Sequence, residues 1–162
     1  MKTAVVLGAG FSKNSGIPVA SEIPKLLIRD DNDRLENMIS LILKDFFKDV
    51  FGYSGGKVLP ELGDIFACLD IALSSGHYLK NDYPPLNLDT IKKLIVYRLF
   101  SVFEECFKYS EEVSELIDVF NKGFEELGFI VLNWDTVLEN YILSADDNIR
   151  IDYCNEASSW KG

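Results

Sequence analysis

Hydrophobic residues of this chain occur either in short unbroken runs or at helical spacing. Unbroken apolar runs cover residues 3–7 and 129–132, and Gly8 ends the first of them. A continuous apolar run of this length, bounded by a glycine, is typical of a strand that is buried on both faces, as in a parallel sheet. We therefore predict strands at these two places, and a third strand over residues 149–153.

Helical spacing of apolar residues dominates the chain between the two apolar runs. The stripes cover residues 35–50, 62–73, 89–107 and 113–124. Residues three and four positions apart share one face of a helix, so each stripe predicts a helix packed against a core rather than a set of cofactor contacts. The last of these helices is predicted to end at Gly128, because glycine is common just after the end of a helix.

Two shorter helices are predicted beside the strands. One runs from Ser21 to Arg29, with Ser21 as its N-cap and Pro24 in the first turn, where proline is tolerated. The other runs from Thr136 to Ser144 and follows the second strand.

The alternation of strands and helices predicts an α/β fold with a parallel sheet. Three strands are fewer than a doubly wound sheet usually has, and this leaves two interpretations. Residues 1–162 are either the first part of a single domain that continues beyond Gly162, which we favour, or a small three-stranded domain covered by helices.

Composition and charge narrow the class of protein. A chain of 162 residues that is 48% hydrophobic and 26% charged suits one soluble domain with its own core. A net charge of −10 disfavours direct binding of nucleic acid or of an anionic membrane. The three cysteines lack metal-binding spacing, and their odd number argues against a disulfide framework, so no metal site is expected. Because no signal peptide and no stretch of membrane-spanning length is found, we expect a cytoplasmic protein without a membrane partner.

The stretch "VVLGAGFSKNSGIP", residues 5–18, is the first candidate site. A strand, a glycine turn and a helix form a phosphate-binding arrangement, in which Gly8 allows a tight turn and Gly10 lets the backbone approach a phosphate. Ser12 adds a hydroxyl near the expected phosphate position. The dehydrogenase fingerprint has a third glycine where this chain has Lys13, so hydride transfer is not expected. The alternative is a glycine turn that serves only the packing of strand against helix.

The stretch "VLNWDTVLEN", residues 131–140, is the second candidate site. Asn133 directly follows a predicted strand, and Asp135 directly precedes a predicted helix. Asp135 is also a suitable N-cap residue, as is Thr136, with which Glu139 would complete a capping box. In open parallel sheets, ligands bind beyond the C-terminal ends of the strands. If the two strands are neighbours, Asn133 and Asp135 face one crevice with the glycine turn and could position a ribose, an amide or a water molecule.

Together, the motifs "GAGFSKNSGIP" and "LNWDTVLE" resemble the NAD-binding motifs of the sirtuin-like family of bacterial NAD hydrolases, which are relatives of the sirtuin deacylases. The stretch "ELGDIFACLDIAL", residues 61–73, also resembles a helix that is common in this family. The resemblance spans residues 5–141. It implies a Rossmann-like, helix-rich parallel sheet with NAD bound across it, and a helical insertion over residues 35–127.

The resemblance also implies a reaction and the residues that carry it. NAD would be cleaved at the nicotinamide–ribose bond to nicotinamide and ADP-ribose, a reaction that commonly serves defence against bacteriophage in such families. Asn133 would position the water or the ribose at this bond, and Asp135 would contact the nicotinamide side, which makes both candidate catalytic residues. The implied NAD-binding residues are Gly8, Ala9, Gly10, Phe11, Ser12, Pro18, Asn133 and Asp135.

The chain departs from the family pattern in three places. After "GIP" it reads "VASEIP" instead of the acidic–aromatic–arginine sequence of the deacylases, so protein deacylation is not expected. Leu132 stands where the family usually has threonine. The family's catalytic histidine follows the asparagine motif in an "HG" pair, whereas the one histidine here, His77, lies upstream in a predicted loop. The resemblance therefore implies that the catalytic histidine lies beyond Gly162 or has been lost, and we expect this chain alone to have little or no activity.

Two other functions remain open from the sequence. The chain could be a non-catalytic module that senses NAD or ADP-ribose and assembles with a partner domain or with further copies of itself. It could also be a helical domain with no ligand.

Overall fold

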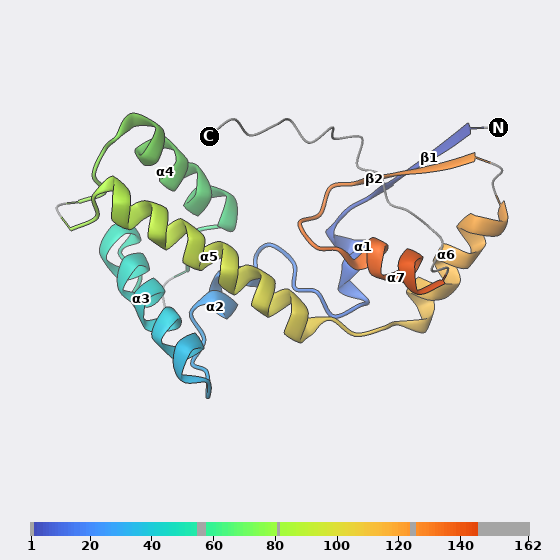
Figure 1. Cartoon of the computed structure of the whole chain (residues 1–162), viewed down its shortest axis with the longest axis horizontal. Helices are drawn as coiled ribbons and strands as arrows, with labels where there is room; N and C mark the ends of the chain where they lie inside the picture. Colours follow the sequence, from blue (N-terminus) through green and yellow to red (C-terminus); the bar gives the residue numbers. More distant parts are fainter. Residues whose placement is uncertain (1, 55–57, 81, 124–125, 146–162) are drawn as a thin grey trace. The chain divides into compact units, whose positions relative to one another are not determined.

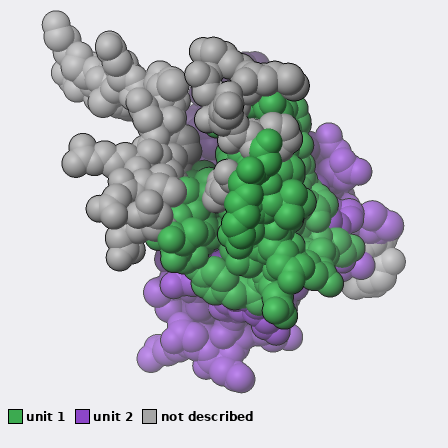
Figure 2. Space-filling model, turned by 90° about the vertical axis from the view of Figure 1, so that its right-hand side faces the viewer, with its two compact units in different colours: residues 1–15, 109–162 green, residues 16–108 purple. Residues whose placement is uncertain are grey.

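The computed structural model describes residues 2–54, 58–80, 82–123 and 126–145, which belong to two compact units. Residues 1–15 and 109–162 form the first, here called the sheet unit, and residues 16–108 form the second, the helical unit (Figure 2). The chain thus passes from one unit to the other twice, at the links 15–16 and 108–109. The predicted insertion, residues 35–127, overlaps the helical unit, but its last helix belongs to the sheet unit.

The sheet unit contains two strands, β1 (Lys2–Leu7) and β2 (Glu126–Val131), which pair in parallel with Val5 opposite Phe129. The ladder continues for one residue, where the Leu132 amide donates to the Leu7 carbonyl at 2.9 Å. The predictions of both strands and of a parallel sheet are confirmed. The predicted third strand, residues 149–153, lies outside the described residues.

Three helices accompany the sheet: α1 (Ala9–Lys13), α6 (Glu111–Gly123) and α7 (Val137–Ala145), all on the same side of β1 and β2 (Figure 1). The ring of Phe120 on α6 packs edge-on against that of Phe129, with 6.0 Å between the ring centroids. On the opposite face, the side chains of Val6 and Ile130 are 61% and 51% exposed. The prediction that both faces of the strands are buried is therefore wrong for the described part of the chain, because one layer of helices covers only one face.

The boundaries around β2 and α1 differ from those predicted. Helix α6 ends at Gly123, and Gly128 lies inside β2 opposite Ala4, so the predicted cap at Gly128 is wrong. Pairing with the six residues of β1 extends β2 toward its N-terminus and includes this glycine in the ladder. Helix α1 begins at Ala9, so that Gly10 of the predicted glycine turn already belongs to its first turn.

The helical unit contains α2 (Ile23–Leu27), α3 (Arg34–Phe51), α4 (Leu62–Ser75) and α5 (Pro85–Cys106). Helix α5 packs against each of the other three and lies between α3 and α4 in Figure 1. Apolar side chains of all four helices form the core of this unit. Its fully buried members include Leu27, Leu43, Phe46, Phe47, Ile65, Leu69, Leu88, Ile95, Leu99 and Val102.

The predicted helices of this unit are confirmed with three corrections. The Ser21 cap is wrong, because α2 begins at Ile23 with Glu22 as its N-cap, while Pro24 does lie in the first turn. Part of the stripe on α3 is also misassigned, since Leu35 and Met38 are exposed. Helix α5 begins at Pro85, before the apolar stripe that was predicted to start at residue 89. No helix in the described ranges is both long enough and apolar enough to cross a membrane.

Candidate functional site

The two candidate motifs meet beyond the C-terminal ends of β1 and β2. Ser12 lies on α1, which follows β1, and its side chain is only 1% exposed. Its hydroxyl donates a hydrogen bond to Asp135 Oδ1 at 2.8 Å and accepts one from Asn133 Nδ2 at 2.9 Å. The bonded residues are 121 and 123 positions apart in the sequence. The parallel pairing of β1 and β2 explains the meeting, because it brings the residues after both strands to one edge of the sheet. We call these three residues the Ser12 cluster.

The direction of the hydrogen bonds in the Ser12 cluster fixes the orientation of Asn133. A hydroxyl has one proton, and an ionised carboxylate can only accept, so the Ser12 proton points to Asp135. Ser12 must then accept from its other partner, which requires the NH2 end of the Asn133 amide to face Ser12. The carbonyl end of that amide has no hydrogen-bond partner among the described residues. It can therefore accept a hydrogen bond from a ligand hydroxyl or from water.

Asp135 also holds the start of α7. Its Oδ1 atom accepts a hydrogen bond from the Val137 main-chain amide at 3.1 Å, in addition to the one from Ser12. Of the two caps that the sequence left open, Asp135 is thus the side chain that binds the first amide of this helix. One carboxylate joins α1 to the N-terminus of α7, so a structural role and a role in the site are combined in this residue.

The glycine turn at the start of α1 has open space beside it. The Gly8 carbonyl accepts from the Phe11 amide at 2.9 Å, and Gly8, Ala9 and Gly10 are exposed while Phe11 is half-buried. A Cβ atom built at Gly8 or at Gly10 would meet no heavy atom of the described residues within 4 Å, and neither glycine has a positive φ. Neither the backbone conformation nor the packing of this structure therefore requires glycine at these two positions.

A second polar cluster in the sheet unit was missed by the sequence analysis. Tyr141, which lies within the helix predicted from Thr136 to Ser144, is 3% exposed. Its hydroxyl lies 3.1 Å from the Ser15 hydroxyl, donates to the Ser110 carbonyl at 3.2 Å, and accepts from the Ser110 amide. The signal was available, because a buried tyrosine usually finds a hydrogen-bond partner for its hydroxyl, but the sequence does not tell which partner.

Two residues named from the sequence, Pro18 and His77, belong to the helical unit. Pro18 follows Gly16 at the start of that unit and is half-buried. His77 follows the C-terminus of α4 and is exposed. Cys68 and Cys106 are free thiols, and burial raises the pKa of Cys68. Among the residues that the structure describes, no group of three or more histidine, cysteine or acidic side chains could hold a metal ion.

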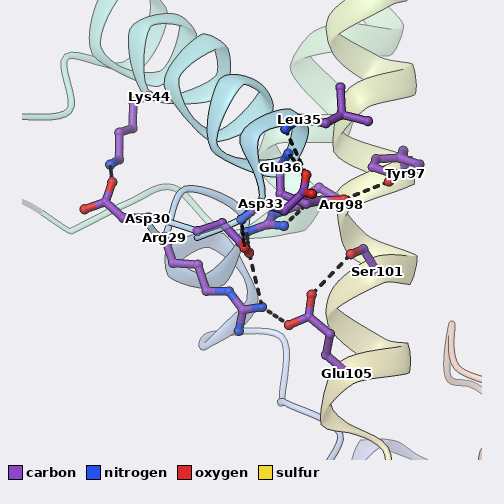
Figure 3. Close-up of polar contacts among 11 residues, drawn as sticks. Arg29, Asp30, Asp33, Leu35, Glu36, Lys44, Tyr97, Arg98, Ser101 and Glu105 are labelled. Carbon is purple, nitrogen blue, oxygen red and sulfur yellow. Dashed lines mark hydrogen bonds and ion pairs between the residues drawn. The ribbon is translucent and has the colours of Figure 1, made fainter.

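The helical unit has a polar network of its own, shown in Figure 3. Arg98 on α5 is completely buried and forms ion pairs with Asp31 at 3.2 Å and with Glu36. Tyr97 donates to Glu36 at 2.7 Å. The main-chain amide of Asp33, followed by the Arg98 guanidinium, holds the pKa of Asp31 below its ordinary value. These bonds tie the loop before α3 and the first turn of α3 to α5.

A polar cavity of about 420 Å³ lies beside this network, lined by Arg29, Asp30, Asp31, Asn32 and Glu105. Its charged side chains already pair with protein groups: Arg29 with Glu105 and Asp31, and Asp30 with Lys44. We therefore interpret the cavity as the surface of a structural ion-pair network.

Comparison of the chain with protein-family models, with curated proteins and with solved structures finds no match. Its function is therefore inferred from the chemistry of the Ser12 cluster and the glycine turn.

Proposed function

We propose that this chain binds NAD beyond the C-terminal ends of β1 and β2, as the nucleotide-binding domain of an enzyme that hydrolyses the nicotinamide–ribose bond. The observation that carries the proposal is the hydrogen-bonded Ser12 cluster. It joins residues of two separate motifs, each of which has the pattern of an NAD-binding motif. Two motifs that bind the same ligand must lie close together, and Ser12, Asn133 and Asp135 are in direct contact. If each motif had matched by chance, there would be no reason for these residues to meet.

The finer fold belongs to this proposal. A parallel strand pair covered by helices is compatible with a Rossmann-like, sirtuin-like domain, in which a ligand binds beyond the strand ends. The open space at Gly8 and Gly10 supports this placement, because no contact with the part of the chain that the structure describes explains two glycines there. A pyrophosphate approaching the main chain does explain them, since a side chain at either position would stand in its way.

The Ser12 cluster suits the chemistry of the bond to be cleaved. Loss of nicotinamide leaves positive charge on the ribose ring in an oxocarbenium-like transition state, and a nearby carboxylate stabilises such charge. Asp135 supplies the carboxylate. The Asn133 carbonyl oxygen, turned away from Ser12, would hold a ribose hydroxyl or the attacking water. Positioning of this kind supplies much of the rate in such a reaction. The products would be nicotinamide and ADP-ribose, and depletion of NAD in defence against bacteriophage is the role we propose for the reaction.

A second candidate function is binding of NAD or ADP-ribose without cleavage. The single histidine of the chain, His77, belongs to the helical unit, so the sheet unit offers no imidazole to act as a general base. A module that only senses or holds the nucleotide would need the same binding residues and no base.

Calorimetry with NAD and with ADP-ribose, on the wild-type chain and on Asn133→Ala, tests the proposal. We expect Asn133→Ala to lower affinity, or turnover if present, by about 100-fold, because it removes the group that positions the ligand. Asn140→Ala is the matched control, since Asn140 is an exposed asparagine on α7. Chromatography of the same mixtures for released nicotinamide separates hydrolysis from binding alone. Absence of heat with either nucleotide, or equal affinity of wild type and Asn133→Ala, would overturn the proposed site.

A further inference from the structure

The Tyr141 hydroxyl connects three segments of the sheet unit. It lies on α7 and bonds to Ser15, which follows α1, and to both the amide and the carbonyl of Ser110, which precedes α6. Its ring packs against that of Tyr109 with 4.9 Å between centroids. Because Ser15 and Tyr141 are both buried, this bond is shielded from water.

These partners stand next to the two links through which the chain leaves and re-enters the sheet unit. Ser15 precedes the link 15–16, and Ser110 closely follows the link 108–109. Within the helical unit, the two segments next to the links also lie close together. The main chain at Gly16 lies so near Cys106 that a Cβ at Gly16 would overlap the Cys106 carbonyl oxygen. The outgoing and returning segments are therefore held together on each side of the links, by Tyr141 on one side and by close main-chain packing on the other.

The same helix also holds the Ser12 cluster. Asp135 at the start of α7 bonds to Ser12, and Tyr141, further along α7, bonds to Ser15. The Ser15 amide donates to the Ser12 carbonyl at 3.1 Å, so the two anchored residues are themselves joined. The segment 12–15 is thus held by Asp135 at the start of α7 and by Tyr141 further along it. The bond between Ser15 and Tyr141 therefore restrains the position of Ser12 relative to Asp135.

We infer that Tyr141 is a positioning residue for the proposed NAD site. Through Ser15, its hydroxyl holds Ser12 in place against Asn133 and Asp135, and it fixes Ser15 and Ser110 to the same helix. This inference rests on the proposed function. The described hydrogen bonds of the Tyr141 hydroxyl go to Ser15 and Ser110, and its effect on the Ser12 cluster passes through Ser15.

Two tyrosine-to-phenylalanine variants test the inference. Tyr141→Phe removes the hydroxyl and keeps the edge-on contact of the ring with that of Tyr109. Tyr109→Phe is the matched control, because it removes the hydroxyl of the same ring pair, which donates to the main-chain carbonyl of Asn140 at 3.2 Å. We expect Tyr141→Phe to weaken NAD binding about tenfold, as loss of one buried hydrogen bond would, and Tyr109→Phe to leave it within about twofold.

A readout without NAD separates this inference from the proposed function. In the free protein, the side-chain NH2 resonances of Asn133 should shift in Tyr141→Phe and stay in place in Tyr109→Phe, because only the first variant releases Ser15, to which Ser12 is joined. Ser15→Ala removes the same bond from the other side and should reproduce the shift, which keeps the test valid if Tyr141→Phe does not fold. Unchanged Asn133 resonances in these variants would overturn the inference, even if wild-type protein binds NAD. If wild-type protein binds no NAD, the proposed function fails, and the resonances still decide whether Tyr141 positions the Ser12 cluster.

Discussion

Replacement of Gly10 by alanine should move stability and ligand binding in opposite directions. Gly10 is the second residue of α1, it has no positive φ, and an added Cβ would meet open space within 4 Å. Gly→Ala at a position whose backbone suits both residues stabilises a protein by about 0.4–1 kcal/mol, chiefly by restricting the unfolded chain. For a chain of this length, that corresponds to a rise in Tm of about 1–4 °C.

The same methyl group occupies the space proposed for the pyrophosphate. We expect Gly10→Ala to weaken NAD binding at least tenfold, which corresponds to about 1.4 kcal/mol. Thermal unfolding followed by circular dichroism gives the first quantity, and calorimetric titration with NAD gives the second. A variant that is merely misfolded cannot give this result, because misfolding would lower Tm as well as affinity.

Gly63→Ala is the matched control for this experiment. Gly63 is also the second residue of its helix, α4, and a Cβ there would likewise meet no heavy atom within 4 Å. It should raise Tm by a similar amount and leave NAD affinity unchanged. Equal affinity of Gly10→Ala and wild type would refute the placement of the ligand over the glycine turn. A lowered Tm of Gly10→Ala would refute the claim that this space is empty.

Three further outcomes follow from the structure. Gly16→Ala should destabilise the helical unit by more than about 1 kcal/mol in urea unfolding, because Gly16 has φ +83° and a Cβ would overlap Cys106; an unchanged midpoint would contradict this. Arg98→Met should cost about 3 kcal/mol in the same assay, since it leaves the carboxylates of Asp31 and Glu36 without their buried cation, and a loss below about 1 kcal/mol would refute it. Because the folded-state pKa of Asp31 is lowered, its contribution to stability should be complete above about pH 4 and should disappear as pH falls through the lowered pKa. Asp31→Asn should flatten that part of the stability–pH profile, and an unchanged profile would contradict the assignment.

The strands and the long helices could be predicted because their patterns reflect local geometry. Apolar runs before Gly8 and Asn133 mark β1 and β2, and a 3.6-residue period marks α3, α4 and α5. The candidate site also followed from order along the chain. Since ligands bind beyond the ends of parallel strands, the residues after each strand were the ones expected to meet, and Ser12, Asn133 and Asp135 do meet.

The remaining features depend on contacts between distant segments. Gly128 looks like a helix cap from its neighbours, but pairing with β1 includes it in a strand. The apolar residues Val6 and Ile130 predict burial, yet no described helix covers their face of the sheet. The bonds of the Tyr141 hydroxyl join positions 126 and 31 residues away, which no local pattern encodes.

Titration of isotope-labelled protein with NAD, followed by nuclear magnetic resonance, tests the central claim most directly. If NAD binds at the Ser12 cluster, the amides of Gly8, Gly10 and Ser12 and the side-chain NH2 of Asn133 will shift together along one saturable curve. The amide of Gly63 in the helical unit serves as an internal reference and will stay in place. Absence of shifts at the Ser12 cluster with millimolar NAD, or shifts confined to other residues, would contradict the proposed site.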